Sequence, residues 1–206
     1  MTSIIGNWQI ILILLIGAAL RFYNLGFIPG PIFDEVFYPD FALSYLKGEP
    51  FFSVHPPLGS YILAFGIYIY DLIPWAEGID LSSAQLDQIN PLSFRWIGAL
   101  AGVILIYVGY KLAIEMLDQR FFALLVALFL ALDGSLMVDS RIGIINIYLC
   151  LFGFMAILFF VKGLKNSEHG SLIVSSFLLG AVISVKWNGL GFWLTLLLFS
   201  LLFFFL

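Results

Sequence analysis

Long apolar runs separated by short polar stretches form the main pattern of this 206-residue chain. A membrane-spanning helix needs roughly 20 predominantly apolar residues, and the runs reach or approach that length. The pattern therefore predicts an all-α integral membrane protein with about six transmembrane helices. The predicted spans cover residues 4–20, 91–113, 121–138, 142–161, 171–185 and 190–206.

The first and last runs each allow a further interpretation. The first could be a secretory signal peptide, but residues 1–8 contain no Lys or Arg for the positively charged start that such peptides have. We therefore expect an uncleaved first span closed by Arg21. The last run stops without a polar flank, so we expect residues 1–206 to be the N-terminal part of a longer domain whose C-terminal half is absent.

Residues 22–92 separate the first two spans and are predicted to form the first external loop. Within it, residues 38–47 have apolar side chains at helical spacing and are followed by Gly48 and Pro50, which indicates a short amphipathic helix on the membrane surface. Residues 58–73 are apolar, but a helix over them would be only about 22 Å long. Because the hydrocarbon core is about 30 Å thick, we expect a second interfacial helix there, with a thin or distorted span as the alternative.

The composition supports the membrane class, and the charge and motifs argue against nucleic acid, a metal or a cofactor. The chain is 62% hydrophobic and 11% charged, which lies far outside the range of soluble domains. A net charge of −4 without a basic cluster argues against nucleic acid as a partner. No metal-ligand spacing or glycine-rich phosphate loop is present, so neither a metal nor a cofactor is predicted. The single Cys150 is expected to be a small core residue.

Charged residues at the span ends predict a polar cavity on one face of the membrane. Lys111 and Arg120 flank one connection between predicted spans, and Lys162 and Lys165 flank another. If these two connections are cytoplasmic, they satisfy the positive-inside rule locally. For any one of Arg95, Arg141 and Lys186, a side chain that reaches toward the lipid headgroups would be explanation enough. Three cations gathered with two carboxylates are better explained by a shared cavity. The face opposite the two connections then carries Asp34, Glu35, His55, Arg95, Asp139, Arg141 and Lys186.

Such a cavity suits group transfer from an anionic, phosphate-linked donor. Arginine offers a bidentate fork to phosphate oxygens and lysine a point charge, and either stabilises a leaving phosphate. A carboxylate opposite them can take the proton from an acceptor hydroxyl as a general base. Asp34 and Glu35 are adjacent and cannot point the same way in an extended loop. We therefore expect one to act in the chemistry and the other to hold the structure or the acceptor.

Five segments of the chain resemble, in order, the motifs of the protein O-mannosyltransferase (PMT) family. Members are polytopic membrane glycosyltransferases of the GT-C class, similar in plan to aminoarabinose transferases and to the catalytic subunit of oligosaccharyltransferase. In that plan the first external loop carries the catalytic carboxylate and two juxtamembrane helices. The segments are Phe33-Asp34-Glu35, Val54-His55-Pro56-Pro57-Leu58, Phe94-Arg95, Asp139-Ser140-Arg141 and Ile183-Ser184-Val185-Lys186-Trp187-Asn188-Gly189-Leu190.

The resemblance and the chemistry of the predicted cavity together assign roles to six residues. Asp34 takes the place of the catalytic acidic residue and Glu35 that of its motif neighbour. The remaining residues are predicted to bind the donor phosphate or the substrate, and these are His55, Arg95, Arg141 and Lys186. One departure is Asn146, which stands where many members have an Asp, so a second acidic group is missing there.

The implied reaction is transfer of a sugar, mannose in this family, from a polyprenyl or dolichyl phosphate carrier to a Ser or Thr hydroxyl of a protein. It would occur at the external face of a multi-pass protein of the cell membrane, or of the endoplasmic reticulum in a eukaryote, with inversion. Residues 1–206 alone need not be active. Two alternatives stay open: a transporter or lipid-handling protein whose charges line a permeation path, and a family member that uses another sugar or a lipid acceptor.

Overall fold

The computed structural model describes residues 7–74 and 80–205 of the chain, and within these ranges all regular structure is helical. Two helices, α4 (Leu92–Leu117) and α7 (Asn146–Asn166), are long and apolar enough to cross a membrane. The other apolar helices are shorter: α1 (Trp8–Phe22), α5 (Arg120–Leu132), α8 (His169–Val185) and α9 (Leu190–Phe205). The all-helical fold with apolar candidate spans is thus confirmed, and the count of six spans stays a prediction.

The span predicted over residues 121–138 is broken in the structure. Helix α5 is followed by α6 (Gly134–Arg141), and the two are bent by 55°. Asp133 explains the break, because its Oδ1 accepts a hydrogen bond of 2.7 Å from the backbone N–H of Leu136 and so caps the first turn of α6. The next helix, α7, begins at Asn146 rather than at residue 142.

Arg21, which was expected only to close the first span, stabilises this break. Its guanidinium group is buried and donates hydrogen bonds to the carbonyl oxygens of Leu130 and Ala131, at 3.0 and 3.1 Å. Carbonyls in the last turn of a helix have no partner within the helix, and apolar surroundings make that costly. The end of α5 is therefore capped by a side chain from α1.

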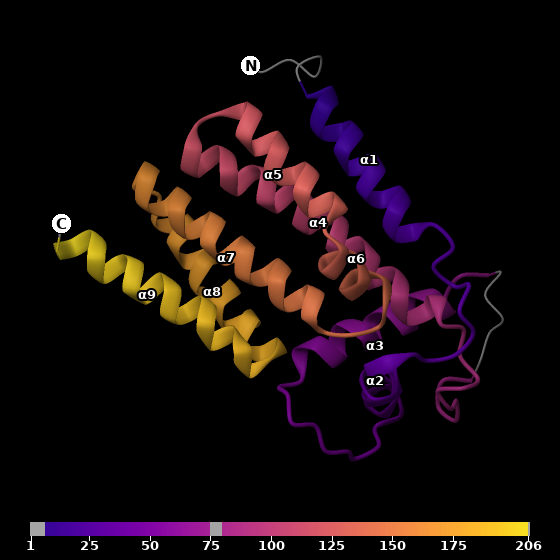
Figure 1. Cartoon of the computed structure of the whole chain (residues 1–206). Coiled ribbons are helices and arrows are strands. Elements are labelled where there is room, and N and C mark those ends of the chain that lie inside the picture. The colour runs from indigo at the N-terminus through magenta and orange to yellow at the C-terminus, as the bar shows by residue number, and fades with distance from the viewer. Residues whose placement is uncertain (1–6, 75–79, 206) are drawn as a thin grey trace.

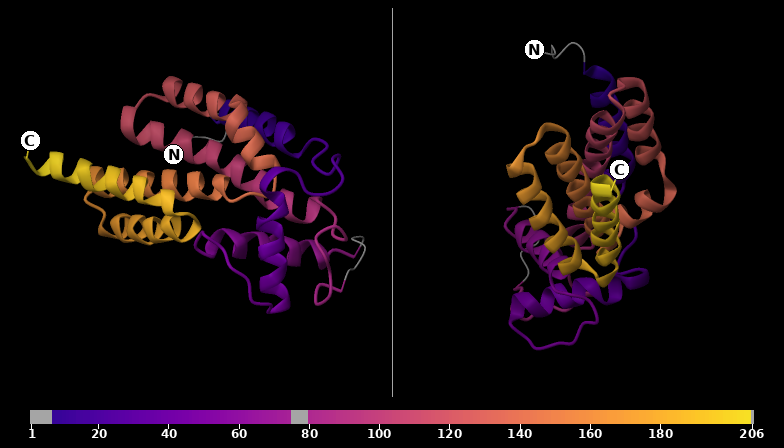
Figure 2. Two further views of the ribbon diagram at one scale, coloured as in Figure 1. Left: turned by 60° about the horizontal axis from the view of Figure 1, so that its bottom comes forward. Right: turned by 90° about the vertical axis from the view of Figure 1, so that its left-hand side faces the viewer.

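The two helices predicted for the first loop are present. They are α2 (Tyr38–Lys47) and α3 (Leu58–Asp71), and a short 3₁₀ helix, η2 (Phe33–Val36), precedes them. The longer helices run alongside one another, whereas α2 and α3 lie together at one end of this bundle (Figure 1). A second view shows that α2 runs across the direction of the long helices (Figure 2). Their position at a membrane surface stays a prediction.

Helix α4 lies at the centre of the packing. One core cluster joins it to α2, α3 and α7 through residues such as Leu43, Leu63 and Phe94, which are completely buried. A second cluster joins it to α1 and α5, where Ala123 and Ala127 let the helix backbones approach closely. The N-terminal turn of α4 is consequently buried from several sides, and that turn carries Arg95.

Candidate active site

Glu35 and Arg95 form a buried ion pair behind the first-loop helices. Glu35 is 0% and Arg95 1% exposed, and the pair is bidentate, with Nε to Oε1 at 2.8 Å and Nη2 to Oε2 at 2.7 Å. Two backbone N–H groups also donate to the Glu35 carboxylate, from Ile32 at 2.9 Å and from Gly143 at 2.6 Å. Glu35 therefore ties η2 to the loop that precedes α7.

Every N–H donor of Arg95 is used within the protein. Besides its two bonds to Glu35, the guanidinium group donates to the carbonyl oxygens of Leu25 at 3.3 Å, Ile28 at 2.9 Å and Gly30 at 2.9 Å. An arginine side chain has five N–H donors, and these five bonds account for all of them. The sequence predicted that Arg95 binds the donor phosphate, but this geometry leaves it no free donor.

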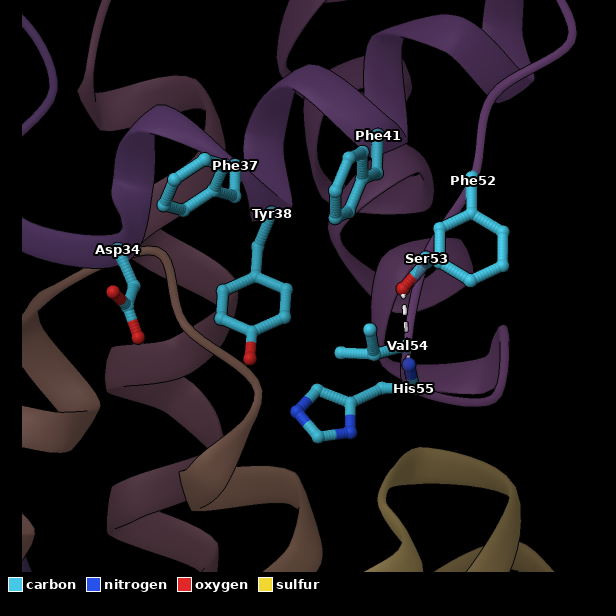
Figure 3. A pocket seen from close by; sticks show the side chains of 8 residues that line it. All are labelled: Asp34, Phe37, Tyr38, Phe41, Phe52, Ser53, Val54 and His55. Carbon is cyan, nitrogen blue, oxygen red and sulfur yellow. Dashed lines mark hydrogen bonds between the residues drawn. The ribbon is translucent and has the colours of Figure 1, made fainter.

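Asp34 faces in a different direction from its neighbour. Residues of a 3₁₀ helix are about 120° apart around the axis, so adjacent carboxylates in η2 diverge. The Asp34 side chain lines a cavity of about 340 Å³, and no described residue donates a hydrogen bond to its carboxylate. Figure 3 shows the carboxylate turned toward the same space as the Tyr38 hydroxyl and the His55 ring. The rest of the lining comes from Phe37, Phe41, Phe52, Ser53 and Val54.

His55 lies opposite Asp34 in this cavity. Its ring is stacked on that of Tyr38, with centroids 6.3 Å apart and planes 19° apart. Nδ1 is buried and has no hydrogen-bond partner among the described residues. Burial lowers the pKa of His55, the charge of Lys186 lowers it further, and Asp34 opposes both effects. A neutral imidazole is therefore expected near neutral pH.

Lys186 reaches the cavity region from the segment between α8 and η3 (Trp187–Gly189). Its Nζ donates a hydrogen bond of 3.0 Å to Oδ1 of Asn146, at the start of α7. The adjacent Trp187 donates its Nε1–H to the carbonyl oxygen of Val54 at 3.0 Å, which fastens the His55 loop to the start of α9.

Arg141 lies apart from the Asp34 cavity. Its Nη1 donates to the carbonyl oxygens of Leu20 and Arg21, at 2.6 and 3.2 Å, and so caps the last turn of α1. It also lines a separate cavity of about 230 Å³ beside Tyr23 and Asn24. The structure thus places Asp34, His55 and Lys186 together and assigns Arg141 to another part of the same end of the bundle.

All six predicted residues do lie at the end of the bundle that carries α2 and α3, where α4 begins, α6 ends and α8 ends (Figure 1). The sequence analysis did not predict Tyr38 as a site residue, although its ring lines the cavity between Asp34 and His55. Its position four residues after Asp34, in the first turn of a helix, was the available signal. Within residues 7–74 and 80–205, no group of three or more His, Cys, Asp or Glu side chains is arranged to hold a metal ion.

Known proteins are similar to this chain over almost its full length. The human Protein O-mannosyl-transferase 1 is 26% identical over 196 residues, which cover 92% of this chain and 24% of the human protein. The Candida albicans Dolichyl-phosphate-mannose--protein mannosyltransferase 6 is 24% identical over 192 residues, covering 85% and 23%. The chain thus spans about a quarter of the length of these relatives.

A solved structure shares the fold. The Saccharomyces cerevisiae protein O-mannosyltransferase Pmt1-Pmt2 complex bound to the sugar donor contains a chain that superposes with a TM-score of 0.82 and 24% identity. The superposition covers 99% of this chain and 29% of the yeast chain. Residues 11–206 match the profile of the family described as dolichyl-phosphate-mannose-protein mannosyltransferase. The chain therefore belongs to the PMT family, as the order of its motifs predicted.

Proposed function

We propose that the protein is a membrane glycosyltransferase that moves mannose from a dolichyl or polyprenyl phosphate carrier to a Ser or Thr hydroxyl of a protein. The observation that carries the proposal is the Asp34 cavity, where a carboxylate without a hydrogen-bond donor faces an imidazole and lies near an ammonium group. Membership of the PMT family supplies the donor and the reaction type.

Asp34 is the proposed general base. The acceptor hydroxyl oxygen attacks the anomeric carbon of the sugar while the bond between that carbon and the phosphate oxygen breaks, which inverts the configuration. The hydroxyl proton passes to the Asp34 carboxylate, and the electron pair of the broken bond leaves with the phosphate. A general base of this kind contributes about 10²- to 10⁴-fold in rate.

Lys186 is the proposed ligand of the carrier phosphate, and His55 lies between it and the base. The phosphate becomes more negative as the sugar departs, and a fixed ammonium group stabilises that charge in a site with little water. Lys186 spends one of its three N–H donors on Asn146 and has two left. Arg141 is proposed as a second, more distant phosphate ligand.

Glu35 and Arg95 are proposed to hold the loop rather than to touch substrate. Their hydrogen bonds fix the backbone of η2 from both sides, and this sets the direction in which Asp34 points. A single turn of 3₁₀ helix has little rigidity of its own. The buried pair supplies it.

The cavity is proposed to open on the external face, with six spans and with α2 and α3 at the membrane surface. Residues 22–92 would then be the first external loop. Cysteine labelling from outside the cell tests this orientation, since a cysteine at position 36 should react and one at position 164 should be protected. The reverse pattern would contradict it.

The activity is tested by incubating membranes that contain the full-length protein with a radiolabelled polyprenyl-phosphate mannose and a Ser/Thr-rich acceptor peptide. We expect label on the peptide, and none when Asp34→Asn replaces the wild type. Asp40→Asn is the matched control, because Asp40 is an exposed carboxylate of α2 outside the Asp34 cavity. Label that crosses the membrane while still attached to its carrier would indicate a transporter. Label on a lipid would indicate a different acceptor.

A further inference from the structure

Tyr38, the first residue of α2, brings a hydroxyl group to the aromatic lining of the Asp34 cavity. The other benzene rings of the lining belong to phenylalanines. The Tyr38 ring packs edge-on against Phe41, with centroids 6.4 Å apart, and stacks on the His55 ring. Both contacts are made by the ring, so a phenylalanine at position 38 would make them equally well. The hydroxyl group is therefore not required for the packing.

The Tyr38 hydroxyl has no hydrogen-bond partner among the described residues. The side chain is 9% exposed, yet its oxygen is not among the buried side-chain atoms without a partner, so the oxygen is open to the cavity. Figure 3 shows the hydroxyl pointing into the space between the Asp34 carboxylate and the His55 ring. Tyrosine hydroxyls in largely buried positions usually have a partner. Here the O–H donor is left for whatever fills the cavity.

The position of this hydroxyl corresponds to the place where the proposed reaction puts the sugar. With inversion, the acceptor oxygen approaches the anomeric carbon on the side opposite the departing phosphate, so the sugar lies between the base and the phosphate ligand. Lys186 is on the His55 side of the cavity, because the next residue, Trp187, bonds to the carbonyl oxygen of Val54. The Tyr38 hydroxyl lies between that side and Asp34, and so beside the sugar.

We propose that Tyr38 is a specificity-determining residue, whose hydroxyl donates a hydrogen bond to one hydroxyl group of the donor sugar. The inference rests on the proposed function in one respect, namely that the cavity receives the sugar of a lipid-linked donor. The rest of the lining suits a sugar as well. Phe37, Phe41 and Phe52 offer apolar surface to its C–H groups, and few polar groups are present to fix its orientation.

A hydrogen bond between Tyr38 and the sugar predicts coupling between a change in the protein and a change in the donor. A site built to bond a substrate hydroxyl disfavours an analogue that lacks it, because a polar group of the site is then left unpaired. Tyr38→Phe removes that polar group and keeps the ring on His55. Once the matching sugar hydroxyl is absent, removal of the tyrosine hydroxyl should cost nothing more, whereas unrelated changes would add.

The experiment compares purified full-length wild type, Tyr38→Phe and Tyr68→Phe. The donors are polyprenyl-phosphate mannose and analogues that each lack one sugar hydroxyl, at carbon 2, 3, 4 or 6. Donor binding without acceptor and kcat/KM for transfer to a Ser/Thr-rich peptide are both measured. With the mannose donor, Tyr38→Phe should lower both binding and kcat/KM about tenfold, the size of one lost hydrogen bond. With one of the analogues, wild type and Tyr38→Phe should be equal.

Tyr68→Phe is the matched control. It removes a hydroxyl group from α3, where Tyr68 is 49% exposed and does not line the Asp34 cavity. We expect it to behave as wild type with every donor. Thermal unfolding of the three proteins should give equal midpoints, because the Tyr38 hydroxyl bonds to no described residue.

An equal loss in Tyr38→Phe with every donor would overturn the inference, because the hydroxyl would then act on the phosphate, the acceptor or the fold. Wild-type behaviour of Tyr38→Phe with the mannose donor would also overturn it. The proposed function can fail separately. If the wild type binds the donors with the predicted pattern but forms no mannosylated product, the role of Tyr38 stands and the enzymatic proposal falls. If product forms without the pattern, the enzymatic proposal stands and the role of Tyr38 falls.

Discussion

Asp34 and Glu35 are neighbours in sequence, yet their surroundings are opposite in almost every respect. Glu35 is completely buried and its carboxylate accepts hydrogen bonds from Arg95, Ile32 and Gly143. Asp34 is partly exposed in a cavity and receives no side-chain hydrogen bond from the described residues. The difference shows how one turn of 3₁₀ helix can hold a fully hydrogen-bonded carboxylate and a carboxylate that faces a cavity at consecutive positions.

The Glu35 side is rigid because both partners of the ion pair are saturated. Charges taken out of water are stable only when paired and fully hydrogen-bonded, and Glu35 and Arg95 meet that condition together. The Asp34 side is not saturated in this way, because its carboxylate faces a cavity lined mainly by aromatic rings, with His55 on the other side. Substitutions on the two sides should therefore fail in different assays.

The strongest expected effect is on the Asp34 side. Asp34→Asn should lower kcat by about 10²- to 10⁴-fold, because it removes the base while preserving shape and polarity. The unfolding midpoint in detergent should not change, since the Asp34 carboxylate accepts no hydrogen bond that holds the fold. Initial rates and thermal unfolding of the same preparation check both halves. Near wild-type turnover of Asp34→Asn would show that another residue is the general base.

The Glu35 side should fail in stability. Arg95→Ala leaves a buried carboxylate unpaired and should lower the free energy of unfolding by about 3–5 kcal/mol. Arg95→Lys should also be destabilising, since an ammonium group cannot replace five donors in a planar arrangement. Unfolding is measured without any donor lipid. A normal midpoint for Arg95→Lys together with a raised KM for the donor would instead restore the role of phosphate ligand to Arg95.

A smaller effect is expected at Gly143, which donates its N–H to Glu35. A Cβ at this position would lie 2.5 Å from Cδ2 of Phe94, a completely buried ring, and 3.2 Å from Pro39. Gly143→Ala should cost about 1–3 kcal/mol, as overpacking usually does. Gly170→Ala is the matched control, because a Cβ there meets no atom within 4 Å. Equal unfolding midpoints for the two variants would show that the backbone around residue 143 can shift to accommodate a Cβ at little cost.

The smallest effect concerns pH and His55. Its pKa in the folded protein lies below the ordinary 6.5, owing to burial and Lys186, with Asp34 in opposition and the Tyr38 ring stacked on it. As pH falls through about 6.5, the unfolded chain takes up a proton that the folded protein does not yet bind, so the free energy of unfolding decreases there. Above that window His55 contributes no pH dependence. Unfolding midpoints at about pH 7.5 and about pH 5.5 should differ less in His55→Gln than in wild type, and equal differences would exclude His55 as the cause.

The first-loop helices could be predicted from sequence because their signals are local. The apolar spacing over residues 38–47 and the stop at Gly48 gave the observed bounds of α2, Tyr38–Lys47, and Gly48 has the left-handed conformation that favours glycine, with φ of 72°. The break between α5 and α6 was missed because the apolar run continues on both sides of Asp133. The Asp133-Gly134-Ser135 sequence was the local signal for a capped start.

The candidate site was predictable only in part, for a physical reason. Counting the predicted spans indicated that the candidate residues lie on one face, and the helix ends that carry them lie at one end of the bundle. Which charge meets which depends on packing between distant elements. Glu35 and Arg95 are 60 positions apart, and no periodicity links them. The sequence does not distinguish a cation that is paired with a buried carboxylate from a cation whose N–H donors are free for a ligand.

The hydrogen bond from Trp187 to Val54 joins residues 133 positions apart, and it bears on the order of biosynthesis. A ribosome adds roughly 5–20 residues per second, so about 7–27 seconds pass between synthesis of the two partners. During that interval the His55 loop exists without its anchor, and Lys186 has not yet been made. The cavity beside Asp34 is therefore completed only after residues 186 and 187 have been synthesised, and until then the carbonyl oxygen of Val54 lacks this partner.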